Sequence, residues 1–206
     1  VAISSNIPDS YFGYMSNLKK VTVLDGVEYI GNNAFKNCSS LEEVIISKTV
    51  TSIGNTIFDS NGKLKTLSID KNNPSYRALE EGFGLVDKTT KTLIFGNETS
   101  VLSDDILHIG DNAINNNKNV TVMNIPSSIQ SIGNYAFYNC VNLEDITLNS
   151  NITSIGDYAF YRCLKIISVD FVTFNKLTYI GAYAFNGCNN IEVISLPESL
   201  ESIGSY

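Results

Sequence analysis

The chain has 206 residues, of which 43% are hydrophobic and 17% are charged, a composition typical of a folded protein with one ordinary domain or one repeat array. Its net charge of -7 argues against a nucleic-acid partner, because phosphate binding requires a face rich in Lys and Arg. No apolar run of about 18 residues is present, so the sequence predicts no membrane span.

A short repeat runs along the whole chain. The stretch SIGNYAFYNC at residues 131–140 returns almost unchanged 23 residues later, as SIGDYAFYRC at residues 154–163. A repeat period of about 20 to 50 residues is the signature of a solenoid, so we expect stacked coils. Successive Ile-Gly pairs are mostly 23 residues apart, with one step of 25 and one of 56. A divergent first copy begins at Ile7. The aligned pairs after it are Ile30-Gly31, Ile53-Gly54, Ile109-Gly110, Ile132-Gly133, Ile155-Gly156, Ile180-Gly181 and Ile203-Gly204.

Each coil is expected to contain the same elements in the same order. A strand with apolar residues at alternating positions comes first, as in Leu41, Val44 and Ile46, and its period of two sends these side chains into the solenoid interior. After a turn, the Gly of the Ile-Gly pair is expected to let the backbone turn. An Ala-Phe pair such as Ala34-Phe35 closes the coil, with the small residue allowing close passage of the chain and the Phe filling the core.

The 56-residue step marks one atypical coil, at about residues 70–100. It equals two periods of 23 plus 10 extra residues. Within it, Phe83, Leu85 and Val86 are followed by the polar run DKTTK and then by residues 93–95, which are apolar. Two apolar runs around a short polar segment predict a β-hairpin that replaces the convex segment of this coil. The hairpin is either an added binding element or a plain inserted loop.

The consensus L-x-x-I-x-L-(P)-x-x-V-x-x-I-G-x-x-A-F-x-x-C resembles the BspA-type leucine-rich repeats over nearly the whole chain. This resemblance implies a curved leucine-rich solenoid, found mostly in secreted or surface proteins of microbes and in several cases implicated in adhesion. We therefore predict that residues 1–206 form a single α/β-type repeat solenoid, mostly β, of about nine coils. Because the chain starts at Val1 and stops within a repeat, we expect it to be a fragment of a longer array.

The four cysteines are predicted to be buried thiols rather than a disulfide or metal set. They fall three residues after the Phe of the Ala-Phe pair or its equivalent, where other coils carry Met or Asn, so the position lines the core. In-register side chains one coil apart would form a disulfide only awkwardly. No close Cys or His pair suits zinc, so no metal or cofactor is expected. The cysteines are Cys38, Cys140, Cys163 and Cys188.

No catalytic residue is predicted. The single histidine, His108, precedes Ile109 at a position where other coils carry Ser, and the G-x-S-x-G motif of serine hydrolases is absent. We interpret His108 as an exposed coil residue, and the chain as not an enzyme.

Two surfaces are candidates for binding. The outward central positions of the strands are mostly small and polar and include no aromatic anchor, so this face has no evident energetic centre. They are Thr22, Ile45, Ser68, Asn124, Thr147, Asp170 and Ser195.

The second surface is a row of tyrosines in the C-terminal half. Tyr135, Tyr158 and Tyr183 precede Ala-Phe pairs, and Tyr138 and Tyr161 follow them. Tyr offers a large face and a hydroxyl at low entropic cost, which suits protein or sugar contacts. Alternatively, the rings stack on one another as structural rungs. These five tyrosines are the predicted ligand-binding residues.

Together these features predict a non-enzymatic binding or adhesion module of a cell-surface or secreted microbial protein. Its partner is expected to be an extracellular protein or glycan. Two alternatives remain open: a passive structural spacer that presents another domain, and a carbohydrate-binding accessory region of an extracellular enzyme.

Overall fold

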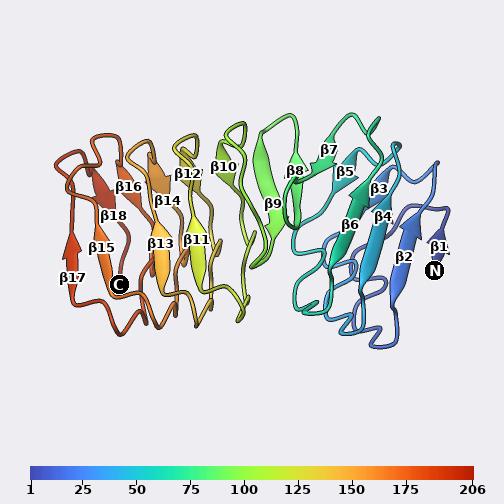
Figure 1. The fold of residues 1–206 in the computed structure, drawn as a ribbon, viewed down its shortest axis with the longest axis horizontal. Coiled ribbons are helices and arrows are strands. Elements are labelled where there is room, and N and C mark those ends of the chain that lie inside the picture. Colours follow the sequence, from blue (N-terminus) through green and yellow to red (C-terminus); the bar gives the residue numbers. More distant parts are fainter.

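The computed structural model describes residues 1–206 and consists of strands and turns, without a helix (Figure 1). Each regular coil contributes a longer strand to one side and a two-residue strand to the other. The longer strands are β2 (Lys20–Val23), β4 (Glu43–Ile46), β6 (Thr66–Ile69), β11 (Val122–Asn124), β13 (Asp145–Thr147), β15 (Ser168–Asp170) and β17 (Val193–Ser195). The two-residue β1 (Ala2–Ile3) pairs with β2 on the same side. We call their outward side the strand face.

The two-residue strands carry the Ile of the repeated Ile-Gly pair. They are β3 (Tyr29–Ile30), β5 (Ser52–Ile53), β10 (His108–Ile109), β12 (Ser131–Ile132), β14 (Ser154–Ile155), β16 (Tyr179–Ile180) and β18 (Ser202–Ile203). Neighbouring coils pair in parallel and in register, so that Val21 lies beside Val44 and Ile132 beside Ile155. The predicted solenoid of about 23-residue coils is confirmed.

The alternating apolar residues point inward, as their spacing predicts. Val21, Val44 and Ile46 are fully buried. The Phe of each Ala-Phe pair also stacks on its counterpart in the next coil: the ring centroids of Phe137 and Phe160 lie 5.1 Å apart, with the rings nearly parallel at 6°. One coil cannot bury these side chains alone, so stacking itself creates the core.

The role predicted for the Ile-Gly glycines is wrong. They do not occupy the left-handed region; the glycines with positive φ are Gly26, Gly82 and Gly187, at other positions. Gly is required because the preceding coil lies too close for a side chain. A Cβ added to Gly156 would lie 2.6 Å from the backbone N of Asn134. The left-handed residues of each turn are instead the one before Ala-Phe and the second after it.

The close approach serves a ladder of side-chain hydrogen bonds that the sequence interpretation missed. The residue after each Gly is usually Asn or Asp, and its side chain accepts a hydrogen bond from the backbone N of its counterpart in the next coil. Asp111 Oδ1 accepts from Asn134 at 2.7 Å, and Asn134 Oδ1 accepts from Asp157 at 2.8 Å. This ladder satisfies amides that the two-residue strands leave unpaired.

The predicted hairpin is present and larger than expected. Strand β8 (Gly84–Asp87) pairs antiparallel with β9 (Thr92–Gly96), and the additional strand β7 (Tyr76–Ala78) pairs antiparallel with β8. Strand β9 then pairs in parallel with β10, so it takes the place of a two-residue strand in the atypical coil. The ring of Phe95 lies 5.4 Å from that of Phe58 and continues the Phe column.

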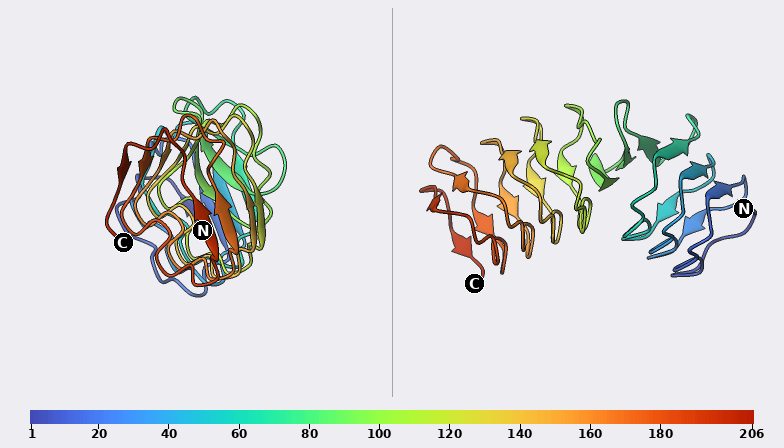
Figure 2. Two further views of the ribbon diagram at one scale, coloured as in Figure 1. Left: turned by 90° about the vertical axis from the view of Figure 1, so that its left-hand side faces the viewer. Right: turned by 60° about the horizontal axis from the view of Figure 1, so that its bottom comes forward.

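The sheets on both sides are interrupted at the hairpin. The longer strands form one sheet from β1 to β6 and two further pairs, β11 with β13 and β15 with β17. On the second side β3 pairs only with β5, whereas the hairpin strands β7, β8 and β9 continue into β10, β12, β14, β16 and β18 as one sheet. The buried apolar residues correspondingly form two clusters, from Ile3 to Leu85 and from Leu79 to Cys188. Figure 2 shows the resulting arch, with the antiparallel strands at its crest and both termini at its feet.

Candidate functional site

The five predicted tyrosines, with Tyr206 in the same register, lie together on the turns of the C-terminal coils. We call them the tyrosine edge. Tyr135, Tyr158 and Tyr183 have φ values of 56°, 55° and 56°, in the left-handed region. A bulky residue is uncommon there, and Asn tolerates this conformation better. Earlier coils carry Asn33 and Asn112 at the same position. Tyr is therefore placed against its backbone preference.

The rings form two parallel stacks. In the first stack, the centroids of Tyr135 and Tyr158 lie 4.9 Å apart and those of Tyr158 and Tyr183 lie 4.7 Å apart. The second stack joins Tyr138 and Tyr161 at 5.1 Å. The two stacks touch side by side, with 5.6 Å between Tyr135 and Tyr138. In-register coils impose this spacing, since equivalent residues repeat at about 4.8 Å.

Stacking decides which parts of the rings a partner can reach. Both faces of Tyr158 are covered by Tyr135 and Tyr183, and this partial burial raises the pKa of Tyr158 above its usual value. The ring edges and hydroxyls stay accessible. The hydroxyls of Tyr29, Tyr76 and Tyr179 bond within the protein, whereas those of the tyrosine edge do not. The surface therefore offers a row of hydroxyls rather than open ring faces.

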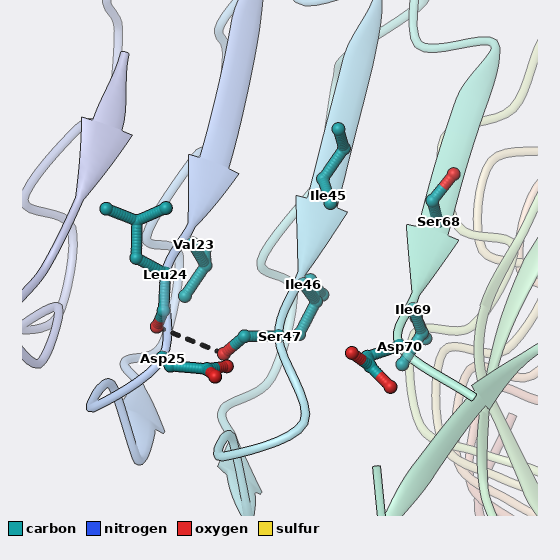
Figure 3. Close-up of a pocket in the computed structure, with 9 residues that line it drawn as sticks. All are labelled: Val23, Leu24, Asp25, Ile45, Ile46, Ser47, Ser68, Ile69 and Asp70. Atoms are coloured by element: carbon teal, nitrogen blue, oxygen red, sulfur yellow. Dashed lines mark hydrogen bonds between the residues drawn. The ribbon is translucent and has the colours of Figure 1, made fainter. Parts of the chain in front are cut away.

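The strand face contains a depression that the sequence interpretation missed. It lies at the ends of β2, β4 and β6, and Figure 3 shows its lining: Val23, Leu24, Asp25, Ile45, Ile46, Ser47, Ser68, Ile69 and Asp70. The sequence contains a signal for it: Ile45 is the only apolar residue in the central outward row, and the small Ser68 lies beside it in register.

The four cysteines line the core, as predicted. All are buried free thiols, and each donates a hydrogen bond to a backbone carbonyl of the preceding coil, as Cys163 does to Phe137 at 3.2 Å. Asn61, at the equivalent position, donates in the same way to Phe35 at 2.8 Å. Burial raises the pKa of Cys140 to about 12. These thiols are therefore not poised as nucleophiles.

His108 is less isolated than predicted. It is half-buried, and its Nδ1 lies 2.8 Å from Ser131 Oγ. The two residues are partners in register between β10 and β12, which is why they meet. No carboxylate hydrogen-bonds to the imidazole. The contact is a pair in the sheet, without the third group that orients a catalytic histidine.

The structure contains no helix capable of crossing a membrane.

Comparison with known protein families gives one match, described as BspA type leucine rich repeat region. It occurs in six copies, over residues 5–81 and 107–206. The gap between the two matched ranges contains β8 and β9. No curated protein sequence matches the chain.

Several solved bacterial structures have a similar fold. A leucine rich cell surface protein from Faecalibacterium prausnitzii A2-165 superimposes with a TM-score of 0.72 at 24% identity, covering 97% of this chain and 62% of that one. The pneumococcal vaccine antigen PcpA gives a TM-score of 0.63 at 18% identity, covering 98% and 60%. The chain thus spans about three fifths of the length of these two proteins. At these identities the likeness establishes the fold alone.

Proposed function

Because the chain belongs to the BspA-type leucine-rich repeat family, we propose that it is a non-enzymatic binding module of a cell-surface or secreted bacterial protein, acting in adhesion. The partner is an extracellular protein or glycan. The similar structures include a cell surface protein and a vaccine antigen, which supports an exposed location. The proposal treats residues 1–206 as one domain, because β9 of the hairpin pairs directly with β10 of the C-terminal coils.

One observation carries the proposal: the tyrosine edge places accessible, unpaired hydroxyls in a row on strained backbone. Left-handed residues other than Gly, Asn and Asp often lie at functional sites, where the strain is offset by another gain. Stacking accounts for part of that gain, at about 0.5–1.5 kcal/mol per aromatic pair. The hydroxyls add donors and acceptors that no neighbouring coil uses. A partner that hydrogen-bonds along the row, such as a glycan or an extended peptide, fits this arrangement.

The test is a binding screen of the purified chain against glycan arrays and extracellular-matrix proteins, with two variants. The first variant carries Tyr135→Asn, Tyr158→Asn and Tyr183→Asn, which places at each site the residue found at Asn33 and Asn112. It should fold and lose binding. The second variant changes the same three residues to Phe, which keeps the stacks and removes only the hydroxyls.

The two variants separate the possible roles of the rings. Loss of binding in both would assign the contacts to the hydroxyls, and loss in the Asn variant alone would assign them to the ring edges. Unchanged binding by a folded Asn variant would rule out the stack of Tyr135, Tyr158 and Tyr183 as the binding site. Absence of any partner for the unmodified chain would favour the passive spacer.

A further inference from the structure

The depression at the ends of β2, β4 and β6 arises from residue size in one register. The central outward row across these strands is Thr22, Ile45 and Ser68, and the next row is Leu24, Ser47 and Asp70. Because Ser47 and Ser68 are small, the side chain of Ile45 stays partly exposed, and a hollow lies beside it between Leu24 and Asp70. The volume, about 620 Å³, is within the range of about 300–1,000 Å³ that ligand sites have.

The lining of the depression is partly apolar and partly acidic. Leu24 is 41% exposed although it is a large aliphatic residue, and it faces the same hollow as Ile45. Figure 3 shows the carboxylates of Asp25 and Asp70 on opposite sides of the end of β4, close to Ser47. The Ser47 hydroxyl donates a hydrogen bond to the carbonyl of Leu24 at 3.0 Å. This bond links β4 to β2 at the floor of the depression.

The two carboxylates differ in their partners. Asp25 Oδ2 lies 3.3 Å from Lys48 Nζ, which compensates its charge. Asp70 has no Lys or Arg nitrogen within 4.0 Å. Its Oδ1 accepts a hydrogen bond from the backbone N of Asn72 at 2.8 Å, and its Oδ2 has no partner in the protein. The exposed Asp70 carboxylate, which lines the same depression as the partly exposed Ile45 and the exposed Leu24, is therefore free to bind a cationic group.

A Lys or Arg side chain has both of the properties that this surface complements. Its methylene stem packs on apolar groups while its charged end stays at the polar rim. We propose that the depression is a docking site for a Lys or Arg side chain of a protein partner, with the stem on Ile45 and Leu24 and the cation at Asp70. The net charge of -7 would also attract a basic partner at long range.

This surface is distinct from the tyrosine edge, which belongs to the coils after the hairpin. The depression is formed by residues 23–70, before the hairpin. The docking site at the depression can therefore be tested independently of the function proposed for the tyrosine edge.

The experiment is an NMR titration of the whole chain with Nα-acetyl-lysine methylamide, followed at the backbone amides. Saturable shifts are expected at residues 23–25, 45–47 and 68–70. The norleucine analogue has a similar aliphatic stem without the charge and should bind more weakly. The glutamate analogue should produce no saturable shift there, because like charges repel.

Two variants of equal charge change provide the decisive comparison. Asp70→Asn keeps the acceptor for Asn72 and should raise the dissociation constant about two- to fivefold, the range of one exposed ion pair. Asp170→Asn is the matched control, because Asp170 also lies on the strand face and accepts from a residue two positions on, at 3.0 Å from the N of Val172. It should leave binding unchanged.

A third variant tests the apolar part of the site. Ile45→Ser should weaken the binding of both the lysine and the norleucine probes. The proposal is overturned if no saturable shift occurs at these residues, if Asp70→Asn and Asp170→Asn behave alike, or if the shifts spread over all exposed carboxylates.

Discussion

Replacement of Gly156 by Ala tests whether close contact between coils, rather than backbone freedom, requires glycine in the Ile-Gly pair. At an ordinary φ, Gly→Ala usually stabilises a protein by about 0.4–1 kcal/mol, because it restricts the unfolded chain. Gly156 has no positive φ, so backbone preference alone predicts a gain. The packing predicts the opposite.

The expected loss follows from three contacts. The added Cβ would lie 2.6 Å from Asn134 N, 2.7 Å from Asn134 Oδ1 and 2.7 Å from Gly133 C. Two of these atoms are backbone, so the coils must separate to admit the methyl group. Overpacking of this kind costs about 1–3 kcal/mol. Separation also weakens the hydrogen bond from Asp157 N to Asn134 Oδ1, and each such bond contributes about 0.5–1.5 kcal/mol. After subtraction of the gain of about 0.4–1 kcal/mol from the restricted unfolded chain, we expect a net loss of about 0.5–4 kcal/mol.

Gly62→Ala provides the control, because a Cβ at Gly62 would meet no atom within 4 Å and its φ is not positive. Urea unfolding followed by far-UV circular dichroism compares the two variants. Since a repeat array can open at one interface without unfolding throughout, amide hydrogen exchange around Gly156 is measured in parallel. The reasoning is refuted if Gly156→Ala is as stable as Gly62→Ala and exchanges no faster than the unmodified chain.

Three further predictions follow from the core and the hairpin. Phe160→Ala should lower the free energy of unfolding by about 3–5 kcal/mol, measured by urea titration, because Phe160 is fully buried between two stacked rings. The Cys140 thiol, whose pKa burial raises to about 12, should resist iodoacetamide at neutral pH until urea unfolds the chain, as intact mass would report. Hydrogen bonding from Ser103, and then the neighbouring Arg77, lowers the pKa of Asp105. The resulting stability is present above the ordinary carboxyl pKa and is lost as the pH falls through the lowered value, so Asp105→Asn should shift the urea midpoint at neutral pH but not below about pH 2.

Each of these predictions has a clear contrary result. An unchanged urea midpoint for Phe160→Ala would show that the Phe column does not support the core. Rapid alkylation of the native chain would contradict burial of Cys140. Equal midpoints for Asp105→Asn and the unmodified chain at neutral pH would show that the pair with Arg77 contributes no stability across the hairpin.

The repeat architecture could be predicted from the sequence because equivalent residues stack in register. The Ile-Gly spacing placed Ile132 beside Ile155, and the same register placed Tyr135 beside Tyr158. The polar run between Val86 and Leu93 indicated the hairpin turn. In each case the information is local, since a period or a short run of residues specifies which positions are neighbours.

Other features depended on distances between coils, which the repeat period does not specify. The role of Gly156 was assigned wrongly because its φ is ordinary, and only the separation of the coils shows why a Cβ is excluded. Strand β7 was missed because it pairs with β8 only once the hairpin is formed. The depression beside Asp70 depends on the relative sizes of side chains in three adjacent coils.

By itself, the sequence therefore determined which residues lie side by side in this protein, since stacking in register converts a linear repeat into neighbouring rows. The tertiary structure alone decided how closely those rows approach and what remains uncovered. In the tertiary structure, neighbouring rings cover both faces of Tyr158, and Asp70 has no Lys or Arg partner. The physical reason is that contact and exposure are set by packing between coils at separations of a few ångströms, which a one-dimensional pattern does not encode.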